Sequence, residues 1–560
     1  MSDKIGIYVC ECGPNIASRV HIDKIMEDLA KLEDFKDKEL VIKNHKLLCS
    51  VDGKKFLEDE INENGFSHLV LAACSPRDHD TTFINVCKKT KLNPYMYRII
   101  NIREQCAWVY SDKDVATEKA VRYIHAGMNR VLYQKPLNET ELDSNPDVLV
   151  IGGGTTGIEA ALSSAGENRK IFLIEKEENL GDLTSKLKEL LPRQGSNLNV
   201  LKQRISDVQN NKNIRIFTNT ELESIVGFLG NFEIVLKNKK SDETTELLVG
   251  AVVMANGAEL QNPQELTDFN FQNDDNVFTA QEVEEMFSQS DKLTLRNGNE
   301  PKSVALVHCV GRKDLGYCSK ICCNYLQKIA HYINEQSNNI EITEFYKHLC
   351  LPNKEDQEYH QKITDKVNFV RITDISLCGT ELNLTKINGE NSTLKPDMVI
   401  LATGIIPAKD NPKFAKMLKV DLDERGFFNE AHLKKDPIST NTDGVFIAGT
   451  TKGPAGISES ILQAQACAGK ILTQLIPGQK IIPEVMVSEI LEAYCRGCKT
   501  CLDVCGFGAI YFDEDKGVSI VNEAICRGCG NCVGSCPSGS IRTKYFTNPQ
   551  LYQEVKEALR

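Results

Sequence analysis

The chain has 560 residues, 21 of them cysteines, with a formal net charge of −12 and a sequence pI near 5.5. This acidic balance argues against a nucleic-acid surface, and no apolar run reaches the roughly 18 residues that a membrane span needs. The N-terminus has no signal-peptide pattern, so the cysteines indicate metal ligands or reactive thiols rather than disulfides. We therefore expect a cytoplasmic protein of about three or four domains.

Residues 1–140 have the pattern of an α/β domain in which strands end at cysteines. Strand-like runs cover residues 5–12, 40–50, 68–76 and 97–106, and a helix-like segment follows at 111–132. Ligands gather at the carboxyl ends of strands in open parallel sheets. The candidate cluster ligands there are Cys10, Cys12, Cys49, Cys74 and Cys106. Buried, unreacted cysteines are the alternative, since free cysteine is a common core residue.

Residues 146–181 read as strand, glycine turn, helix and strand. Gly152, Gly154 and Gly157 form G-x-G-x-x-G directly after the apolar strand DVLVI. Glycines in such a turn let the backbone approach a pyrophosphate, which then lies at the helix N-terminus. Glu175 closes the next strand at the separation expected of an acid that binds a ribose hydroxyl. The segment predicts a dinucleotide site, against which a merely structural turn is the alternative.

Three later segments resemble the two-dinucleotide-binding flavoproteins, such as thioredoxin reductase. Residues 252–258 and 399–407 look like their strand-plus-glycine boxes, and 440–456 looks like their late flavin motif, with Thr450 where an acid is usual. The resemblance implies FAD and a thioredoxin-reductase-like domain over residues 146–480. The candidate FAD-binding residues are Gly152, Gly153, Gly154, Thr156, Gly157, Glu175, Lys176, Gly257, Thr403, Gly404, Gly449 and Thr450.

In those reductases a second, nicotinamide-binding glycine turn is expected near residue 305. The strand is present at 302–312, but no G-x-G-x-x-G follows it, and the C-x2-C redox disulfide is absent from this domain too. Four cysteines stand there instead, enough to hold a cluster: Cys309, Cys318, Cys322 and Cys323. Adjacent cysteines suit a regular cuboidal site poorly, and a redox disulfide or structural thiols are the alternative. Outside these groups, Cys350, Cys378 and Cys467 read as ordinary core or surface residues.

Eight cysteines between 495 and 536 form two runs of C-x2-C-x2-C-x3-C, the pattern that binds [4Fe–4S] clusters in bacterial two-cluster ferredoxins. In that arrangement the fourth cysteine of each run binds the other cluster. One predicted set is Cys495, Cys498, Cys501 and Cys536, and the other is Cys526, Cys529, Cys532 and Cys505. Structural zinc is the alternative, but zinc explains neither the third and fourth cysteines nor Pro537. We expect a two-cluster α+β ferredoxin domain at 486–545 and a tail at 546–560.

Together these motifs resemble the A subunit of heterodisulfide reductase, an iron–sulfur flavoprotein of anaerobic archaea and bacteria. The likeness covers almost the whole chain, including LVLAACSPRDHD, GGGTTGIEAAL, CVGRKDLGYCSKICC and AICRGCGNCVGSCPSGSI. It implies FAD, two ferredoxin-type [4Fe–4S] clusters and a non-standard [4Fe–4S] cluster at Cys309–Cys323. The N-terminal cysteines are the candidates for a further cluster.

The resemblance implies an oxidoreductase subunit that passes electrons between a donor module, FAD and partner subunits, with no side chain as general acid or base. The best-known members perform flavin-based electron bifurcation between ferredoxin and a disulfide-reducing pair. The implied partners in a hetero-oligomer are HdrB- and HdrC-like subunits, ferredoxin and an electron-donor module (a hydrogenase, a dehydrogenase or an MvhD-like protein).

Two features depart from many full-length members of that family. Residues 230–257 run without a cysteine where an extra ferredoxin module is often inserted, and residues 182–215 also lack cysteines. Ala455 follows Gly453 and Pro454, where many bifurcating members carry lysine. The sequence predicts a short form, for which a shorter relay without bifurcation is an alternative. A stand-alone NAD(P)H-dependent disulfide or sulfur reductase and a scaffold with structural metal are the rival functions.

Overall fold

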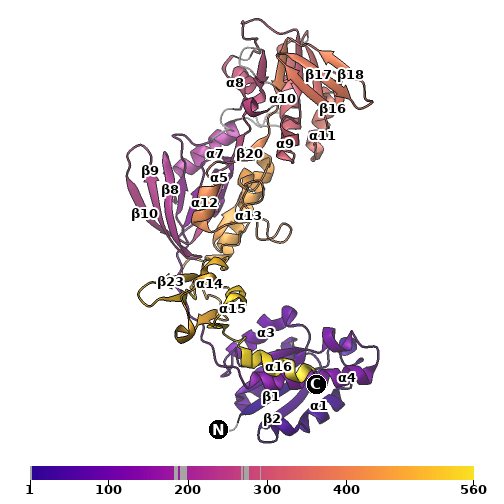
Figure 1. The fold of residues 1–560 in the computed structure, drawn as a ribbon, viewed down its shortest axis with the longest axis vertical. Coiled ribbons are helices and arrows are strands. Elements are labelled where there is room, and N and C mark those ends of the chain that lie inside the picture. The colour runs from indigo at the N-terminus through magenta and orange to yellow at the C-terminus, as the bar shows by residue number, and fades with distance from the viewer. Residues whose placement is uncertain are drawn as a thin grey trace. The chain divides into compact units, whose positions relative to one another are not determined.

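The structure is a computed structural model that describes residues 3–181, 187–188, 198–266, 269, 271, 276–290, 292–337 and 339–559. It divides into two compact units. One consists of Met1–Glu141 together with Ile482–Arg560, and the other of Leu142–Ile481. The first unit therefore combines both ends of the chain (Figure 1). Among the described helices, none has the length and apolar character needed to cross a membrane.

The N-terminal part of the first unit is a four-stranded parallel sheet in the order β2-β1-β3-β4. Its strands are β1 (Lys4–Cys10), β2 (Glu39–His45), β3 (His68–Ala73) and β4 (Tyr97–Asn101). The helices between and after them are α1 (Ile22–Ala30), α2 (Val51–Asn64), α3 (Pro76–Lys88) and α4 (Lys113–Val131). The central strands β1 and β3 are almost continuously buried, as expected for parallel strands covered on both faces. Because all four strands are parallel, their carboxyl ends meet at one edge.

The C-terminal helix α16 (Asn548–Leu559) packs on α4 with its polar side inward. Gln550 and Glu557 are buried, whereas Leu551, Tyr552, Val555 and Leu559 are exposed. Glu554 accepts a hydrogen bond from Arg98 at 2.9 Å and another from the buried Arg130. The helix is thus attached by ionic contacts rather than by an apolar face.

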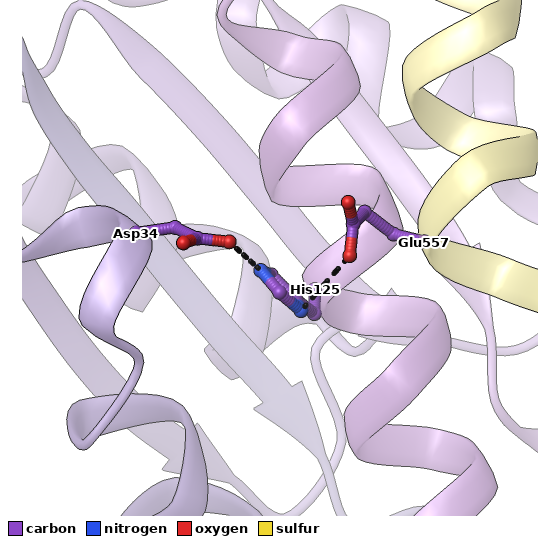
Figure 2. Close-up of side chains that lie close together, drawn as sticks. All are labelled: Asp34, His125 and Glu557. Atoms are coloured by element: carbon purple, nitrogen blue, oxygen red, sulfur yellow. Dashed lines mark ion pairs between the residues drawn. The ribbon is translucent and has the colours of Figure 1, made fainter. Parts of the chain in front are cut away.

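Figure 2 shows His125 of α4 between two carboxylates. Its Nε2 lies 3.5 Å from Asp34 and its Nδ1 lies 3.9 Å from Glu557 of α16. The two ring nitrogens face carboxylates on opposite sides of the imidazole. In this position His125 can bridge the two carboxylates. Its contact with Glu557 is a third polar contact between α16 and the N-terminal domain, after those of Arg98 and Arg130 with Glu554.

The ferredoxin part of the first unit consists of two small antiparallel pairs and two short helices. Its strands are β22 (Ser488–Ile490) with β25 (Ile541–Thr543), and β23 (Ile510–Asp513) with β24 (Val518–Val521). The short helices are α14 (Thr500–Asp503) and α15 (Asn531–Ser535). Each helix contains the third cysteine of its run.

The second unit contains a five-stranded parallel sheet in the order β21-β11-β5-β6-β7. Its strands are β5 (Val148–Ile151), β6 (Ile171–Ile174), β7 (Ile214–Phe217), β11 (Ala251–Met254) and β21 (Val445–Ile447). Helices α5 (Thr155–Ser164) and α13 (Ile457–Gln474) pack against each other, and α7 (Leu198–Asn210) contacts α5. An antiparallel sheet follows β7 in the chain, formed by β8 (Thr220–Phe228), β9 (Asn231–Asn238) and β10 (Thr244–Val249).

The same unit has a seven-stranded sheet in the order β13-β19-β14-β15-β16-β17-β18, parallel from β13 to β16. Its strands are β13 (Val277–Thr279), β14 (Ser303–Val307), β15 (Glu341–Tyr346), β16 (Asn368–Cys378), β17 (Glu381–Lys386), β18 (Asn391–Leu394) and β19 (Met398–Leu401). Its helices are α8 (Ala280–Ser290), α9 (Arg312–Leu315), α10 (Cys322–Gln336) and α11 (Lys354–Ile363).

Two short crossing strands, β12 (Ala258–Leu260) and β20 (Ile405–Pro407), pair antiparallel between the sheets, and α12 (Asn411–Leu418) follows β20. The middle of the chain therefore has two parallel-sheet domains joined by a double crossing.

Candidate functional site

The glycine turn after β5 requires glycine for steric reasons. Gly152 has a φ of +108°, and a Cβ there would lie 2.2 Å from the carbonyl oxygen of Ala255. A Cβ on Gly157 would lie 1.8 Å from the carbonyl oxygen of Gly152. Glycine alone lets α5 start this close to the strand, with Gly154 as its N-cap. The unbonded N–H groups at the start of the helix then face the space where a pyrophosphate would bind.

Glu175 directly follows β6 and turns back to the glycine turn. Its Oε2 accepts a hydrogen bond from the Gly153 N–H at 2.6 Å, and its Oε1 accepts one from the Glu177 N–H at 2.9 Å. The side chain is almost fully buried. Lys176, the next residue, lies 3.6 Å from Asp410. The structure thus brings the predicted acid, but not the predicted lysine, against the glycine turn.

Hydroxyl and carboxamide groups of the segments that follow β11 and β21 form a hydrogen-bond network beside the glycine turn. The Gly257 N–H donates to Thr451 Oγ1 at 3.1 Å, and that hydroxyl donates to Asn256 at 3.2 Å. Asn256 in turn donates to the buried Asn411 at 2.9 Å. Sequence reasoning selected Thr450, whereas Thr451 makes these contacts. The sequence gives a weak indication that Asn256 belongs to the site, since it directly precedes the glycine of a strand-plus-glycine box.

Gly449 joins the late flavin motif to the first turn. A Cβ on Gly449 would lie 2.4 Å from Thr156 Oγ1, and the Gly449 N–H donates to Gln463 at 2.8 Å. The glycine turn, the acid beside it and the backbone N–H groups match what the pyrophosphate and ribose of FAD need. The residues present therefore fit FAD.

Gly404, which follows Thr403, lies in different surroundings. Its carbonyl accepts a hydrogen bond from the Gln261 N–H at 2.8 Å, and a Cβ there would lie 2.4 Å from Leu315. The next N–H, that of Ile405, donates to Ser319 at 2.9 Å. The structure therefore places Gly404 beside the segment between Cys309 and Cys322, two cysteines of the second group.

The second cysteine group lies at the carboxyl ends of the parallel strands β14 and β15. Cys309 comes two residues after β14 with a φ of +59°, and α10 begins at Cys322. The His348 carbonyl, after β15, accepts from the thiols of Cys309 at 4.0 Å and Cys323 at 3.8 Å. The Cys350 N–H donates to the Cys323 sulfur at 3.2 Å. Cys350 therefore belongs beside this group, although sequence reasoning set it aside.

A fully buried acid–base pair adjoins these thiols. His308 Nε2 lies 2.8 Å from Glu344, and neither side chain is exposed. Burial would lower the pKa of His308, but contacts with Cys323 and Glu344 raise it to about 9. The neighbouring Cys322 and His308 lower the pKa of Cys323. Positive charge and N–H donors thus favour an anionic sulfur here, which is the form that binds iron.

The N-terminal sheet brings four of its five candidate cysteines together: Cys10, Cys12, Cys49 and Cys74. Burial, together with repulsion from Cys12 and Cys49, raises the pKa of Cys10 to about 11. Burial, together with repulsion from Cys49 and Cys10, also raises the pKa of Cys74 to about 11. Thiolates this close repel one another unless a cation lies between them, so the donor set suits an iron cluster.

Two other residues define the edge of this N-terminal group. Arg103 lies close to Cys12, stacks over Trp108 at 5.1 Å and pairs with Asp78 at 2.7 Å. Cys106 lies in the π-helix Arg103–Ala107 and is fully buried. Burial raises the pKa of its thiol to about 12, against the opposing effect of Lys119. The structure therefore does not bring Cys106 to the other four thiols, although it also follows a strand.

The ferredoxin cysteines line two cavities. One is lined by Cys495, Cys498, Cys501 and Cys536, and the other by Cys505, Cys526, Cys529 and Cys532. Each cavity takes three cysteines from one run and the fourth from the other, as the spacing predicts, and four thiols around one cavity fit a cuboidal cluster. Burial would raise the pKa of Cys536, but the hydroxyls of Ser540 and Ser538 lower it to about 7. Ligation itself stays a prediction.

Two family models match the chain. The model described as pyridine nucleotide-disulphide oxidoreductase matches residues 146–468, and the 4Fe-4S dicluster domain matches residues 494–540. They confirm the predicted fold class, an α/β flavoprotein core followed by a two-cluster ferredoxin domain, and the predicted cofactors, FAD and [4Fe–4S] clusters.

Curated relatives match over the full length. An iron–sulfur A subunit of the CoB–CoM heterodisulfide reductase of Methanopyrus kandleri is 30% identical over 652 aligned positions, covering 100% of this chain and 99% of that protein. The A subunit of the H2:CoB-CoM heterodisulfide,ferredoxin reductase of Methanothermobacter thermautotrophicus is 29% identical, covering 99% of this chain and 97% of that protein. Since this chain has 560 residues, at least 92 positions of the first alignment have no counterpart in it.

Proposed function

Because this chain belongs to the family of the iron–sulfur A subunits of heterodisulfide reductase, we propose that it is the electron-transferring subunit of a heterodisulfide-reductase-like complex. As a member of that family it is an oxidoreductase. When bound, FAD supplies exchange of one or two electrons, and each [4Fe–4S] cluster supplies exchange of one. The protein holds these groups and sets their surroundings.

One observation carries the proposal. The carboxyl ends of β14 and β15, where a pyridine-nucleotide enzyme needs a glycine turn, carry Cys309 and the loop that reaches Cys350. Thiols there favour iron over a nicotinamide cofactor. This favours one-electron exchange with protein partners over the rival function, an NAD(P)H-dependent reductase.

The proposed ligands follow from the geometry. Each ferredoxin cavity holds one cluster, the group at Cys309–Cys323 holds a third, and Cys10, Cys12, Cys49 and Cys74 hold a fourth. Cys106 is left out because the charge that acts on its thiol is that of Lys119, whereas Cys10 and Cys74 are affected by one another, by Cys12 or by Cys49. Residues of the glycine turn, Glu175 and the Thr451 network hold FAD.

The proposed partners are a disulfide-reducing pair like the B and C subunits, an electron-donor module and ferredoxin. Four relatives carry ferredoxin in their names. The missing alignment positions and the cysteine-free residues 230–257 support a short form without the inserted ferredoxin module. In this form, bifurcation requires that ferredoxin and the disulfide-reducing pair be reduced together by one donor.

The test is anaerobic reconstitution of the full chain with iron, sulfide and FAD. We expect one FAD and about 16 iron atoms per chain, with EPR signals after dithionite reduction. Stoichiometric zinc with fewer than four irons would contradict the proposal and support a scaffold. Bleaching of the flavin by NADH or NADPH without a partner protein would support the stand-alone reductase instead.

A further inference from the structure

The loop after β15 brings a fifth thiol to the cysteine group of the seven-stranded sheet. Cys350 is 27 residues from Cys323 in the chain, yet its N–H donates to the Cys323 sulfur at 3.2 Å. The His348 carbonyl in the same loop contacts the thiols of Cys309 and Cys323. Cys350 also packs against the buried cluster of side chains that includes Cys322 and Cys323. The loop thus borders the whole group.

Cys322 and Cys350 border the same two cysteines. Cys322 adjoins Cys323 in α10, and Cys323, burial and the nearby Cys309 and Cys318 raise the pKa of its thiol. Burial raises the pKa of the Cys350 thiol, and Cys318 and Cys323 are close enough to raise it further. Each of the two can therefore complete a four-thiol set with Cys309, Cys318 and Cys323.

Helix geometry separates the adjacent pair. Cys322 and Cys323 are the first two residues of α10, and successive side chains on an α-helix point about 100° apart. Two adjacent side chains of one helix therefore bind the same iron–sulfur cluster less easily than two side chains from separate segments. Cys350 approaches from the β15 loop and is partly exposed, whereas Cys322 is buried.

We propose that Cys350 is an iron ligand of this site and that Cys350 and Cys322 are alternative ligands to the same iron. A cuboidal cluster offers one thiolate position per iron, so four of the five thiols bind at a time. The inference rests on the proposed function, since it requires a cluster at Cys309–Cys323.

The test measures iron per chain in full-length C322A, C350A and C322A/C350A after anaerobic reconstitution, with FAD content as the measure of folding. We expect each single variant to keep its iron and the double variant to lose about four iron atoms. C378A, at an exposed cysteine of the same domain, is the matched control. Loss of four irons in C322A alone would overturn the inference, and so would full iron in the double variant.

Variants at Cys318 test whether a cluster binds at this site, separately from whether Cys322 and Cys350 exchange as its ligands. If C318A loses about four irons while C322A/C350A keeps them, the cluster exists and only the exchange of ligands is wrong. If C309A/C318A, which leaves only three of the five thiols, also keeps all its iron, no cluster binds here and the proposed function of this site fails. The EPR spectra of the single variants give a second measurement, since a cluster bound through a different cysteine changes its signal.

Discussion

Arg130 on α4 donates a hydrogen bond to Glu554 on α16, 424 residues further along the chain. Its side chain is 1% exposed, and Arg98 donates to the same carboxylate. One acid on the last helix therefore satisfies two cations of the N-terminal domain.

Replacing Glu554 by Gln should destabilise the N-terminal domain by about 3 kcal/mol, because a buried arginine loses its counter-charge. Urea unfolding followed by the fluorescence of Trp108, the single tryptophan of the chain, measures this. Glu27→Gln, in an exposed pair with Lys31, is the control and should change stability by less than about 0.5 kcal/mol. Equal effects of the two substitutions would show that the α16 contact is unimportant.

The contribution of Glu554 should also depend on pH. Burial raises its pKa, but Arg98 and Arg130 outweigh burial and hold that pKa below its ordinary value. Such a carboxylate stabilises the fold fully above its unfolded pKa of about 4.3, and the stabilisation is lost as pH falls through the folded pKa. The difference in unfolding free energy between wild type and E554Q should therefore shrink between pH 7 and pH 3. A difference independent of pH would refute the ionic role.

Gly157→Ala should abolish FAD binding and leave the iron content unchanged. The added Cβ would lie 1.8 Å from the Gly152 carbonyl oxygen, so the turn and the helix could not keep their separation. Gly166→Ala is the matched control, since a Cβ there meets no atom within 4 Å. Absorbance at the flavin band and iron analysis of the same samples give both quantities. Normal FAD content in G157A would be inconsistent with a binding turn.

Thr451→Val should weaken FAD binding roughly tenfold, because the Gly257 N–H loses its acceptor in a buried site. Thr450→Val should have a smaller effect if Thr451 is the residue that supports the site. Fluorescence titration of the apoprotein with FAD measures both constants. Thr451→Ser keeps the hydroxyl and should restore the affinity. A larger loss in T450V than in T451V would favour the assignment made from the motif.

Local patterns predicted the parts of the site that lie close together in the chain. The turn at Gly152–Gly157 and the first three cysteines of each ferredoxin run lie close together in the chain, and the repeated motif itself indicates that the fourth cysteine comes from the other run. The position of Cys350 beside Cys323 could not be predicted locally, because only the pairing of β15 beside β14 brings the two together. Cys106 follows a strand, as other candidate cysteines do, but it lies in a π-helix and is fully buried.

The helix α16 was predicted only as a tail, because its pattern is the reverse of a typical surface helix. Gln550 and Glu557 are buried, whereas its large apolar side chains are exposed. A prediction from amphipathicity would therefore turn the wrong face of the helix toward the domain. The buried arginines that explain this pattern lie more than 400 residues earlier in the chain.

The wide separation of Arg130 and Glu554 has a consequence for biosynthesis. At 5–20 residues per second, the ribosome needs roughly 20–85 s to extend the chain from one residue to the other. During that interval the nascent N-terminal domain holds a guanidinium without its carboxylate. Its contact with α16 therefore forms only after the entire flavin core has been synthesised.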